Sequence, residues 1–357
     1  MDLCKCDMII SQANKLRKYC EAMISFIWTD QNPMYSGRGG TENFTAGQIR
    51  ELTIMGIDAR VITVGQHLEN SSSQFTDISF WNVPTINDLE KLDDTIIFVN
   101  VPFPIETKNR SFCIFHCPPR LPIHLRAEYK AAMENKTAIV ASKYMQNLWS
   151  NYLGLPKDSI HVAYPFADPH FAKATRTTTE TDITTVLFAG RLVIEKGIYL
   201  YLESMHHDVL ESGYIFSATT AGNQTFDGKK IEESLKNDSK INLINAKHNP
   251  REMAELLAEN RILVMPSNSF FWHEGFGMLS VEAQHAGCEV IASNDGGLPE
   301  TDCGGLTLFE PGNSRDLAET IHRVAQGNQI TAEQQAARSQ FFTRNQSAKN
   351  LLKILDQ

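Results

Sequence analysis

The sequence predicts an α/β protein made of two doubly wound domains, each built on a parallel sheet that is covered by helices. Short apolar runs recur along the chain with helical patterns between them. The runs are apolar throughout instead of alternating, which is typical of parallel strands buried on both faces. The pattern occurs in both halves of a chain of 357 residues, a length that usually divides into two domains.

In the first half the predicted strands are 22–28, 58–64, 95–101, 111–116, 137–142 and 160–165. A helix is predicted between the first two strands, because the apolar residues recur at a roughly helical spacing: Phe44, Ile49, Leu52 and Ile54. Gly56 is expected to end this helix, since glycine is the usual residue just past a helix C-terminus.

In the second half the predicted strands are 184–190, 214–222, 241–246, 261–267, 288–293 and 306–310. The stretch from 166 to 183 has a proline and a threonine cluster without apolar periodicity, so it is interpreted as a linker region. The expected organisation is a first domain at 1–167, a linker at 168–183, a second domain at 184–335, and a C-terminal helix at 336–357 that could pack back on the first domain.

Composition excludes several classes of function. The formal net charge of −9 argues against a nucleic-acid partner. The seven cysteines show no paired Cys-x-x-Cys motifs, so neither a zinc site nor a disulfide framework is expected, and a reducing compartment fits best. Neither a basic leader with an apolar core nor a run of roughly 18 apolar residues is present. The expected location is the cytoplasm, with peripheral contact at the inner membrane face left open.

Two cations follow the first predicted strand of the second half. In "FAGRLVIEKG", residues 188–197, Arg191 and Lys196 flank a strand-to-helix turn. A guanidinium for bidentate contact and an ammonium as a point charge would suit a diphosphate. The turn is neither a Walker loop nor a G-x-G-x-x-G motif. Two surface cations near a turn would give the same pattern.

Two glutamates straddle a glycine-rich turn further along. In "HEGFGMLSVEAQHAG", residues 273–287, Glu274 and Glu282 are separated by seven residues, and a helix is predicted to start at the turn. Free N–H groups at a helix N-terminus bind anions, and carboxylates beside them could accept hydrogen bonds from a bound polyol. The alternative is a helix-dipole carboxylate and a solvated one. The turn and the start of the helix comprise Gly275, Phe276, Gly277 and Met278.

The first half offers weaker signals. The loop "SGRGGTE", residues 36–42, contains Gly39 and Gly40 and could wrap a ligand or be a plain turn. His116 ends a predicted strand and could reach the same ligand, or be structural. The basic segment 118–130 could face a lipid headgroup or an anionic acceptor, or be a solvated helix face.

The second half has two further loops of interest. "SNDGGLPE", residues 293–300, is interpreted as another glycine-rich loop on the phosphate side. The aromatic run Phe270–Trp272 could stack on a sugar or be a buried plug. All these signals fall at the carboxyl ends of predicted strands, so they are expected to converge on one site.

In this order the motifs resemble the retaining glycosyltransferases of family 4 (glycosyl transferases group 1), which have the GT-B fold. The resemblance extends from about Ser25 to Val324 and is strongest from Val186 onward. It implies two Rossmann-like domains that face an interdomain cleft. One departure is "YPFADPHF", where the family commonly has Asn-Gly-Val-Asp; Asp168 remains while the Asn-Gly turn is lost.

The resemblance implies a donor site in the second domain. Arg191 and Lys196 would bind the donor diphosphate and stabilise it as a leaving group. Glu282 would bind the ribose hydroxyls. Glu274 would bind the transferred sugar, together with the backbone N–H groups of Phe276, Gly277 and Met278.

The resemblance also implies roles for the first domain and for the chemistry. Gly39 and Gly40 would approach the donor phosphate and the acceptor, and His116 would lie on the sugar or acceptor side. The leaving phosphate oxygen would take the acceptor's proton on the front face, so no protein nucleophile, metal or other cofactor is expected.

The expected activity is transfer from a nucleotide-diphosphate sugar, UDP in preference to GDP, to the hydroxyl of a saccharide, lipid-linked or small-molecule acceptor. Two alternatives stay open: a nucleotide-sugar 2-epimerase of the same fold, and a catalytically silent sugar-nucleotide binder.

Overall fold

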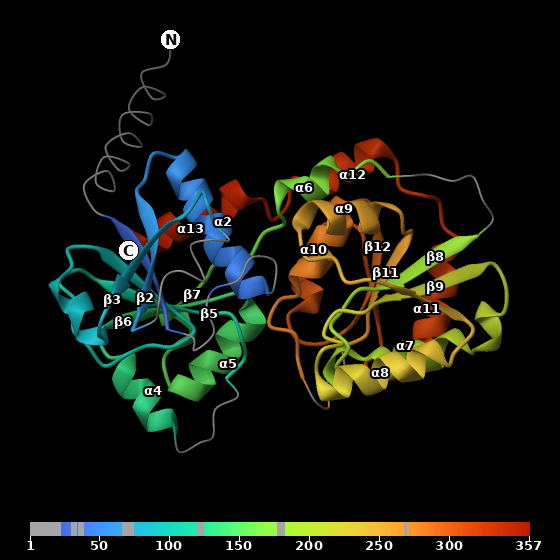
Figure 1. The fold of residues 1–357 in the computed structure, drawn as a ribbon, viewed down its shortest axis with the longest axis horizontal. Coiled ribbons are helices and arrows are strands. Elements are labelled where there is room, and N and C mark those ends of the chain that lie inside the picture. Colours follow the sequence, from blue (N-terminus) through green and yellow to red (C-terminus); the bar gives the residue numbers. More distant parts are fainter. Residues whose placement is uncertain are drawn as a thin grey trace, which may run out of the picture. The chain divides into compact units, whose positions relative to one another are not determined.

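The structure is a computed structural model, and it describes residues 23–29, 34, 39–65, 75–119, 125–176, 183–267, 270 and 272–357. The chain forms two compact units (Figure 1). The first unit consists of Met1–Ala141, Met145–Ala163 and Arg344–Gln357, and the second of Ser142–Tyr144 and Tyr164–Thr343.

A parallel sheet forms the centre of the first unit. Its strands are β1 (Ile24–Trp28), β2 (Ala59–Val64), β3 (Ser79–Val83), β4 (Thr95–Val99), β5 (Ser111–Phe115), β6 (Lys136–Val140) and β7 (Ile160–Val162). The order is β3-β2-β1-β4-β5-β6-β7, and all described pairs are parallel. Successive strands are thus added toward one edge of the sheet from β1 to β3 and toward the other edge from β4 onward, as in a doubly wound fold.

The helices of the first unit include one from the far end of the chain. They are α2 (Gly40–Ile54), α4 (Arg126–Ala132), α5 (Lys143–Leu153) and α13 (Arg344–Leu355). Polar side chains join α13 to α2: Gln48 donates to Ser347 Oγ at 2.7 Å, and Asn345 donates to Glu51 Oε1 at 2.8 Å. The C-terminal helix is thus part of the first unit's packing.

The second unit has a sheet of the same kind. Its strands are β8 (Thr184–Phe188), β9 (Tyr214–Thr219), β10 (Ile241–Ile244), β11 (Ile262–Met265), β12 (Glu289–Ser293) and β13 (Leu306–Phe309). The order β10-β9-β8-β11-β12-β13 is that of a Rossmann sheet, with its reversal between β8 and β11.

Helices cover both faces of the second sheet. They are α6 (Pro169–Lys173), α7 (Ile198–Met205), α8 (Phe226–Lys236), α9 (Pro250–Ala258), α10 (Met278–His285), α11 (Ser314–Ala325) and α12 (Ala332–Arg338). Figure 1 shows α7 and α8 on one side of the sheet and α9 and α10 on the other. Buried apolar side chains of β8, β9, β11, α7, α8 and α11 form one core cluster.

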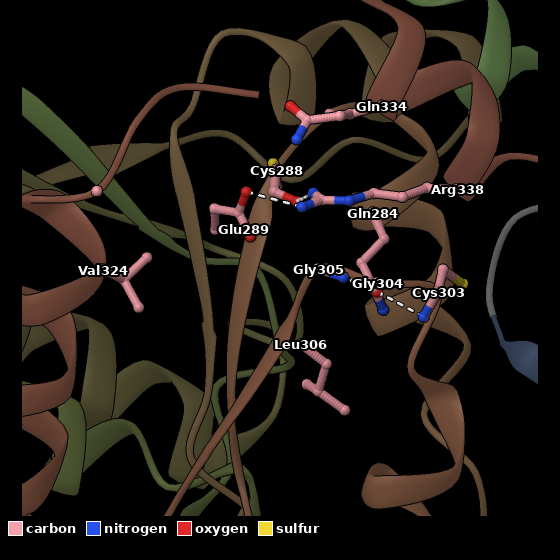
Figure 2. A network of polar contacts seen from close by, with 12 residues as sticks. Gln284, Cys288, Glu289, Cys303, Gly304, Gly305, Leu306, Val324, Gln334 and Arg338 are labelled. Carbon is pink, nitrogen blue, oxygen red and sulfur yellow. Dashed lines mark hydrogen bonds and ion pairs between the residues drawn. The ribbon is translucent and has the colours of Figure 1, made fainter. Parts of the chain in front are cut away.

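Two polar side chains order the amino ends of β12 and β13 (Figure 2). Arg338 donates to Cys288 O at 3.1 Å and to Glu289 Oε1 at 2.8 Å. Gln284 Oε1 accepts from the backbone N–H groups of Cys303 and Gly305, at 2.8 and 3.1 Å. A Cβ at Gly305 would overlap the Arg338 guanidinium, so the missing side chain lets the arginine reach its partners.

The two doubly wound α/β domains predicted from the sequence are confirmed, and each predicted strand is present. Gly56 follows α2 with φ of 77°, as expected of a glycine past a helix end. One strand, β3, was not predicted. It is the sheet edge and alternates exposed and part-buried residues ("SFWNV"), so it lacks the continuous apolar run of the interior strands.

Two predicted boundaries are wrong. The second unit already includes Tyr164, and the predicted linker 168–183 begins with α6, which packs on α9. The helix predicted over 336–357 is broken between α12 and α13, where Phe342 has φ of 47°. The part before the break belongs to the second unit and the part after it to the first.

Candidate active site

The two predicted cations and the first predicted carboxylate of the second unit lie at the switch point of its sheet. Arg191 and Lys196 follow β8, while Ser267 and Glu274 follow β11. The sheet order reverses between these two strands, and doubly wound sheets bind ligands at the carboxyl ends of the strands at such a point. Two motifs far apart in the sequence therefore share one edge.

Lys196 and Glu274 form an ion pair at this edge. The Lys196 ammonium contacts Glu274 Oε1, and Ser267 Oγ donates to the same oxygen at 3.1 Å. Glu274 is only 8% exposed, and a carboxylate removed from water in this way needs a partner for its charge. The ammonium of Lys196 is that partner. The two residues were predicted to have separate roles, and the ion pair between them was not predicted.

Arg191 is different, because its side chain is exposed and has no hydrogen-bond or ion-pair partner within the part of the chain that the structure describes. Its loop is fixed through the backbone: Leu192 N–H donates to Ala221 O at 2.6 Å, and Gly222 lies against Arg191 Cβ. A well-anchored loop thus presents an unpaired guanidinium, which suits an anionic ligand.

Helix α10 begins at the predicted glycine-rich turn. Gly277 is its N-cap with φ of 98°, a left-handed conformation that favours glycine, and no side chain among the described residues caps the helix. The first N–H groups of a helix have no partner within it, so those that follow Gly277 can bind an anion or a hydroxyl oxygen. The Phe276 side chain is 4% exposed and packs on Tyr164 and Phe342, so a ligand would contact this residue through its backbone.

The glycine loop 293–300 packs directly on the Glu274 turn. Gly297 N–H donates to Glu274 O at 2.8 Å, and a Cβ at Gly296 would lie 2.6 Å from the same oxygen. A Cβ at Gly297 would overlap the carbonyl oxygen of Gly275. The two glycines thus permit close contact between two loops, a role that differs from the phosphate-side role predicted for them.

Glu282 lies on α10 and is part-buried. Burial, and then the nearby negative charge of Asp168, raises the pKa of Glu282 to about 8. Asp168 is the N-cap of α6 and accepts from His170 N–H at 3.0 Å. At neutral pH Glu282 is therefore largely protonated, and it could donate as well as accept a hydrogen bond.

This pKa predicts a pH-dependent stability. The folded state holds the Glu282 proton more tightly than the unfolded chain, whose glutamate has its ordinary pKa of 4.5. The free energy of unfolding should fall as pH rises from 4.5 to about 8, and the loss is complete above that. Compared with Glu282→Gln, wild type should lose about 1–3 kcal/mol across this window, measured by urea denaturation at each pH. Parallel pH curves for the two proteins would contradict the prediction.

The predicted residues of the first unit lie at the carboxyl edge of its own sheet. Gly39 is extended and precedes α2, and Gly40 is its first residue. His116 follows β5, donates its N–H to Asn100 Oδ1 at 2.8 Å, and contacts Phe44 of α2 edge-on at 4.7 Å. Its Nε2 is buried without a partner in the described part of the chain, and burial lowers its pKa to about 4. His116 is therefore neutral at pH 7.

Other predicted segments are only partly described. Arg126 donates to the carbonyls of Asn151 and Tyr152 at the end of α5, so it stabilises a helix C-terminus. Arg120, His124, Phe271 and Gly37 lie outside the described residues. Phe270 is 88% exposed.

Sequence reasoning missed Ser267, His273, Asp295 and the role of Glu300. Ser267 lies next to the end of β11, a position that could have indicated it. His273 pairs with Asp295 at 2.7 Å and Glu300 binds distant backbone groups, and neither contact has a motif in the sequence.

Within the described ranges, no group of three or more His, Cys, Asp or Glu residues could hold a metal ion, and no helix is long and apolar enough to cross a membrane. Cys113, Cys288 and Cys303 are buried free thiols.

Two Rossmann-like domains with sites at the strand ends define the GT-B class, and solved structures share this fold. A glycosyltransferase from Rickettsia africae ESF-5 has a TM-score of 0.70 at 18% identity over 94% of this chain and 98% of that one. Sucrose-phosphate synthase from Thermosynechococcus elongatus has a TM-score of 0.70 at 15% identity, over 93% of this chain and 98% of that one. Anabaena Alr3699/HepE, solved with UDP and glucose, has a TM-score of 0.69 at 16% identity, over 94% of this chain and 99% of that one.

Residues 173–340, somewhat less than half of the chain, match the family described as glycosyl transferases group 1. The lipopolysaccharide 1,2-N-acetylglucosaminetransferase of Salmonella typhimurium is 27% identical over 46% of this chain and 45% of the relative. An uncharacterized glycosyltransferase of Methanocaldococcus jannaschii is 29% identical over 57% of this chain and 53% of the relative. The chain spans about half the length of the curated relatives that it matches.

Proposed function

We propose that the protein is a glycosyltransferase that moves a sugar from a nucleotide-diphosphate donor to a hydroxyl acceptor. The observation that carries the proposal is the arrangement of Arg191, Lys196 and Glu274 at the switch point of a group 1 domain. It combines one unpaired cation with a cation–carboxylate pair at an edge suited to ligands.

A donor would exchange partners with the existing ion pair. Its diphosphate takes the Lys196 ammonium, and a hydroxyl of its sugar donates to the Glu274 carboxylate, so neither buried charge is left unpaired. Arg191 binds the same diphosphate bidentately. Both cations then stabilise the negative charge that develops as the bond to the sugar breaks, which is the main requirement of this chemistry.

The finer features of the proposal are a UDP donor, retention of configuration and no metal. The UDP preference is supported by neighbours of the same fold solved with UDP, UDP-glucose and UDP-2-fluoro glucose. Retention follows if the leaving phosphate oxygen takes the acceptor's proton on the same face of the sugar. Arg191 and Lys196 supply the charge that a metal ion supplies in other transferases.

In the first unit we assign Gly39, Gly40 and His116 to the acceptor and sugar side. The support is that all three lie at the carboxyl edge of that unit's sheet and that α2 contacts His116 through Phe44. A neutral His116 can donate a hydrogen bond to a sugar hydroxyl or accept one from it, and it adds no charge to the site.

The test is donor turnover with Arg191→Ala. A panel of UDP- and GDP-sugars is incubated with the protein and a mixture of saccharide, lipid-linked and small-molecule acceptors, and release of the nucleoside diphosphate is followed. Wild type should consume a UDP-sugar, and Arg191→Ala should raise the donor KM by about 10- to 100-fold. Arg315→Ala, which changes an arginine that is 79% exposed on α11, is the matched control and should behave as wild type.

Two outcomes would replace the proposal. If donor binding is seen by thermal shift but no donor is consumed, the protein is a silent binder. If the nucleotide sugar is converted to its epimer and no sugar is transferred, the protein is an epimerase.

A further inference from the structure

We propose that Glu300 is a positioning residue for the transfer reaction: it holds the turn that carries Glu274 through two other segments of the chain. The inference rests on the proposed function and deepens it. All the residues involved belong to the second unit.

Glu300 uses both of its oxygens. Oε2 accepts from the backbone N–H of Lys143 at 2.8 Å and from the Tyr164 hydroxyl at 2.8 Å, and Oε1 accepts from the backbone N–H of Tyr144 at 2.7 Å. Hydrogen bonds to an ionised carboxylate are about twice as strong as neutral ones. One side chain thus fixes two segments that lie more than 130 residues away in the sequence.

The first of these segments, Ser142–Tyr144, lies against the residues around Glu274. Ser142 Oγ donates to Gly275 O at 2.5 Å. The Tyr144 ring lies 6.0 Å from the ring of His273, whose Nδ1 pairs with Asp295 at 2.7 Å. Ser142–Tyr144 therefore contacts the chain on both sides of Glu274.

The second segment supplies Tyr164, which supports the next residue of the turn. Its ring centroid lies 5.7 Å from that of Phe276 and 5.6 Å from that of Phe342, and Phe276 and Phe342 are 5.4 Å apart. Burial and the hydrogen bond to Glu300 raise the pKa of Tyr164, so the hydroxyl stays protonated and remains a donor. The three rings keep Phe276 in place.

Glu300 is itself tied to the turn along the chain. It belongs to the short 3₁₀ helix η6 (Leu298–Thr301), and the residue before that helix, Gly297, donates to Glu274 O at 2.8 Å. The contacts made through Ser142–Tyr144, Tyr164 and Gly297 all converge on residues 273–276. Arg191 is held by the separate loop after β9, so it does not depend on this network.

This separation predicts which kinetic parameter changes. The network orients the carboxylate and N–H groups that would contact the sugar, while Arg191 would still bind the diphosphate. Glu300→Gln keeps the size of the side chain but turns an amide NH₂ toward backbone donors. We expect kcat to fall by about 10- to 100-fold, because small misplacements of reacting groups cost rates of this order. Donor KM and UDP affinity should change less than about twofold.

Matched variants separate positioning from folding. Tyr164→Phe removes one of the three hydrogen bonds and should give a smaller fall in kcat. Glu252→Gln changes an exposed glutamate in the first turn of α9 and should change nothing. An unchanged kcat per folded molecule in Glu300→Gln, with a lowered melting temperature, would reduce Glu300 to a stabilising residue. A parallel loss of UDP affinity and kcat would also overturn the proposal.

A readout without turnover keeps the test independent of the proposed function. Amide hydrogen exchange of a peptide covering 273–279 should be faster in Glu300→Gln than in wild type and unchanged in Glu252→Gln. If wild type transfers no sugar, the proposed function fails, and faster exchange of this peptide still supports the role of Glu300. Equal exchange in Glu300→Gln and wild type would overturn it.

Discussion

Replacing Lys196 with methionine should lower both the free energy of unfolding and the rate of donor turnover. Glu274 is 8% exposed, and without its ion-pair partner it would be a buried carboxylate whose remaining side-chain donor among the described residues is Ser267. Breaking a buried pair by removing one partner costs about 3–5 kcal/mol. Loss of the cation that stabilises the leaving diphosphate should lower donor turnover by at least about 100-fold.

A second substitution separates the two effects. In Lys196→Met/Glu274→Gln the buried group is a neutral amide, so most of the lost stability should return, because burying an amide costs far less than burying a charge. Activity should not return. Urea denaturation and donor turnover of the single and double variants give both measurements. Lys91→Met, in an exposed pair with Asp88, is the control and should have no measurable effect. Wild-type stability in Lys196→Met would contradict the assigned ion pair.

Gly197→Ala should destabilise the protein by about 4 kcal/mol or more, since it combines backbone strain with a steric overlap. Gly197 has φ of 75°, which side chains disfavour, and a Cβ there would overlap the carbonyl oxygen of Pro266. Pro266 directly precedes Ser267, which holds Glu274, so the displacement would reach the site. The molecules that still fold should turn over donor poorly.

Gly312→Ala provides the matched control. Gly312 has φ of 77°, close to that of Gly197, but nothing lies within 4 Å of the position that its Cβ would take. Its substitution should cost only the backbone strain, about 1–2 kcal/mol, without loss of activity. An equal loss of unfolding free energy in the two variants would show that the Pro266 contact is unimportant.

The fold could be predicted where one local pattern determined the structure. Interior strands such as β8 and β11 are buried on both faces, so their apolar runs are continuous and visible in the sequence. The edge strand β3 has no such run. The break at Phe342 was not predicted, because no glycine or proline marks it in the sequence; Phe342 has φ of 47° there, and its ring packs against Tyr164 and Phe276.

The site could be predicted as a place but not as a set of contacts. Doubly wound topology brings the residues after β8 and β11 to one edge, so Arg191 and Glu274 could be assigned to a common site. The contacts of these side chains depend on distances in the folded protein, and the spacing of residues along the sequence does not predict those distances. The ion pair of Lys196 and Glu274 joins residues 78 apart, and the effect of Asp168 on Glu282 joins a predicted linker to a helix.

The two units are interleaved along the chain, and this limits how the protein can be divided or recombined. A fragment cut at the bounds of the family match, 173–340, would lack Ser142–Tyr144, Tyr164 and Phe342, three of the supports of the Glu274 turn. A chimera that exchanges such a fragment between relatives would join a turn from one parent to supports from the other. New donor preferences made by recombination should therefore require crossover points before Ser142 and after Thr343.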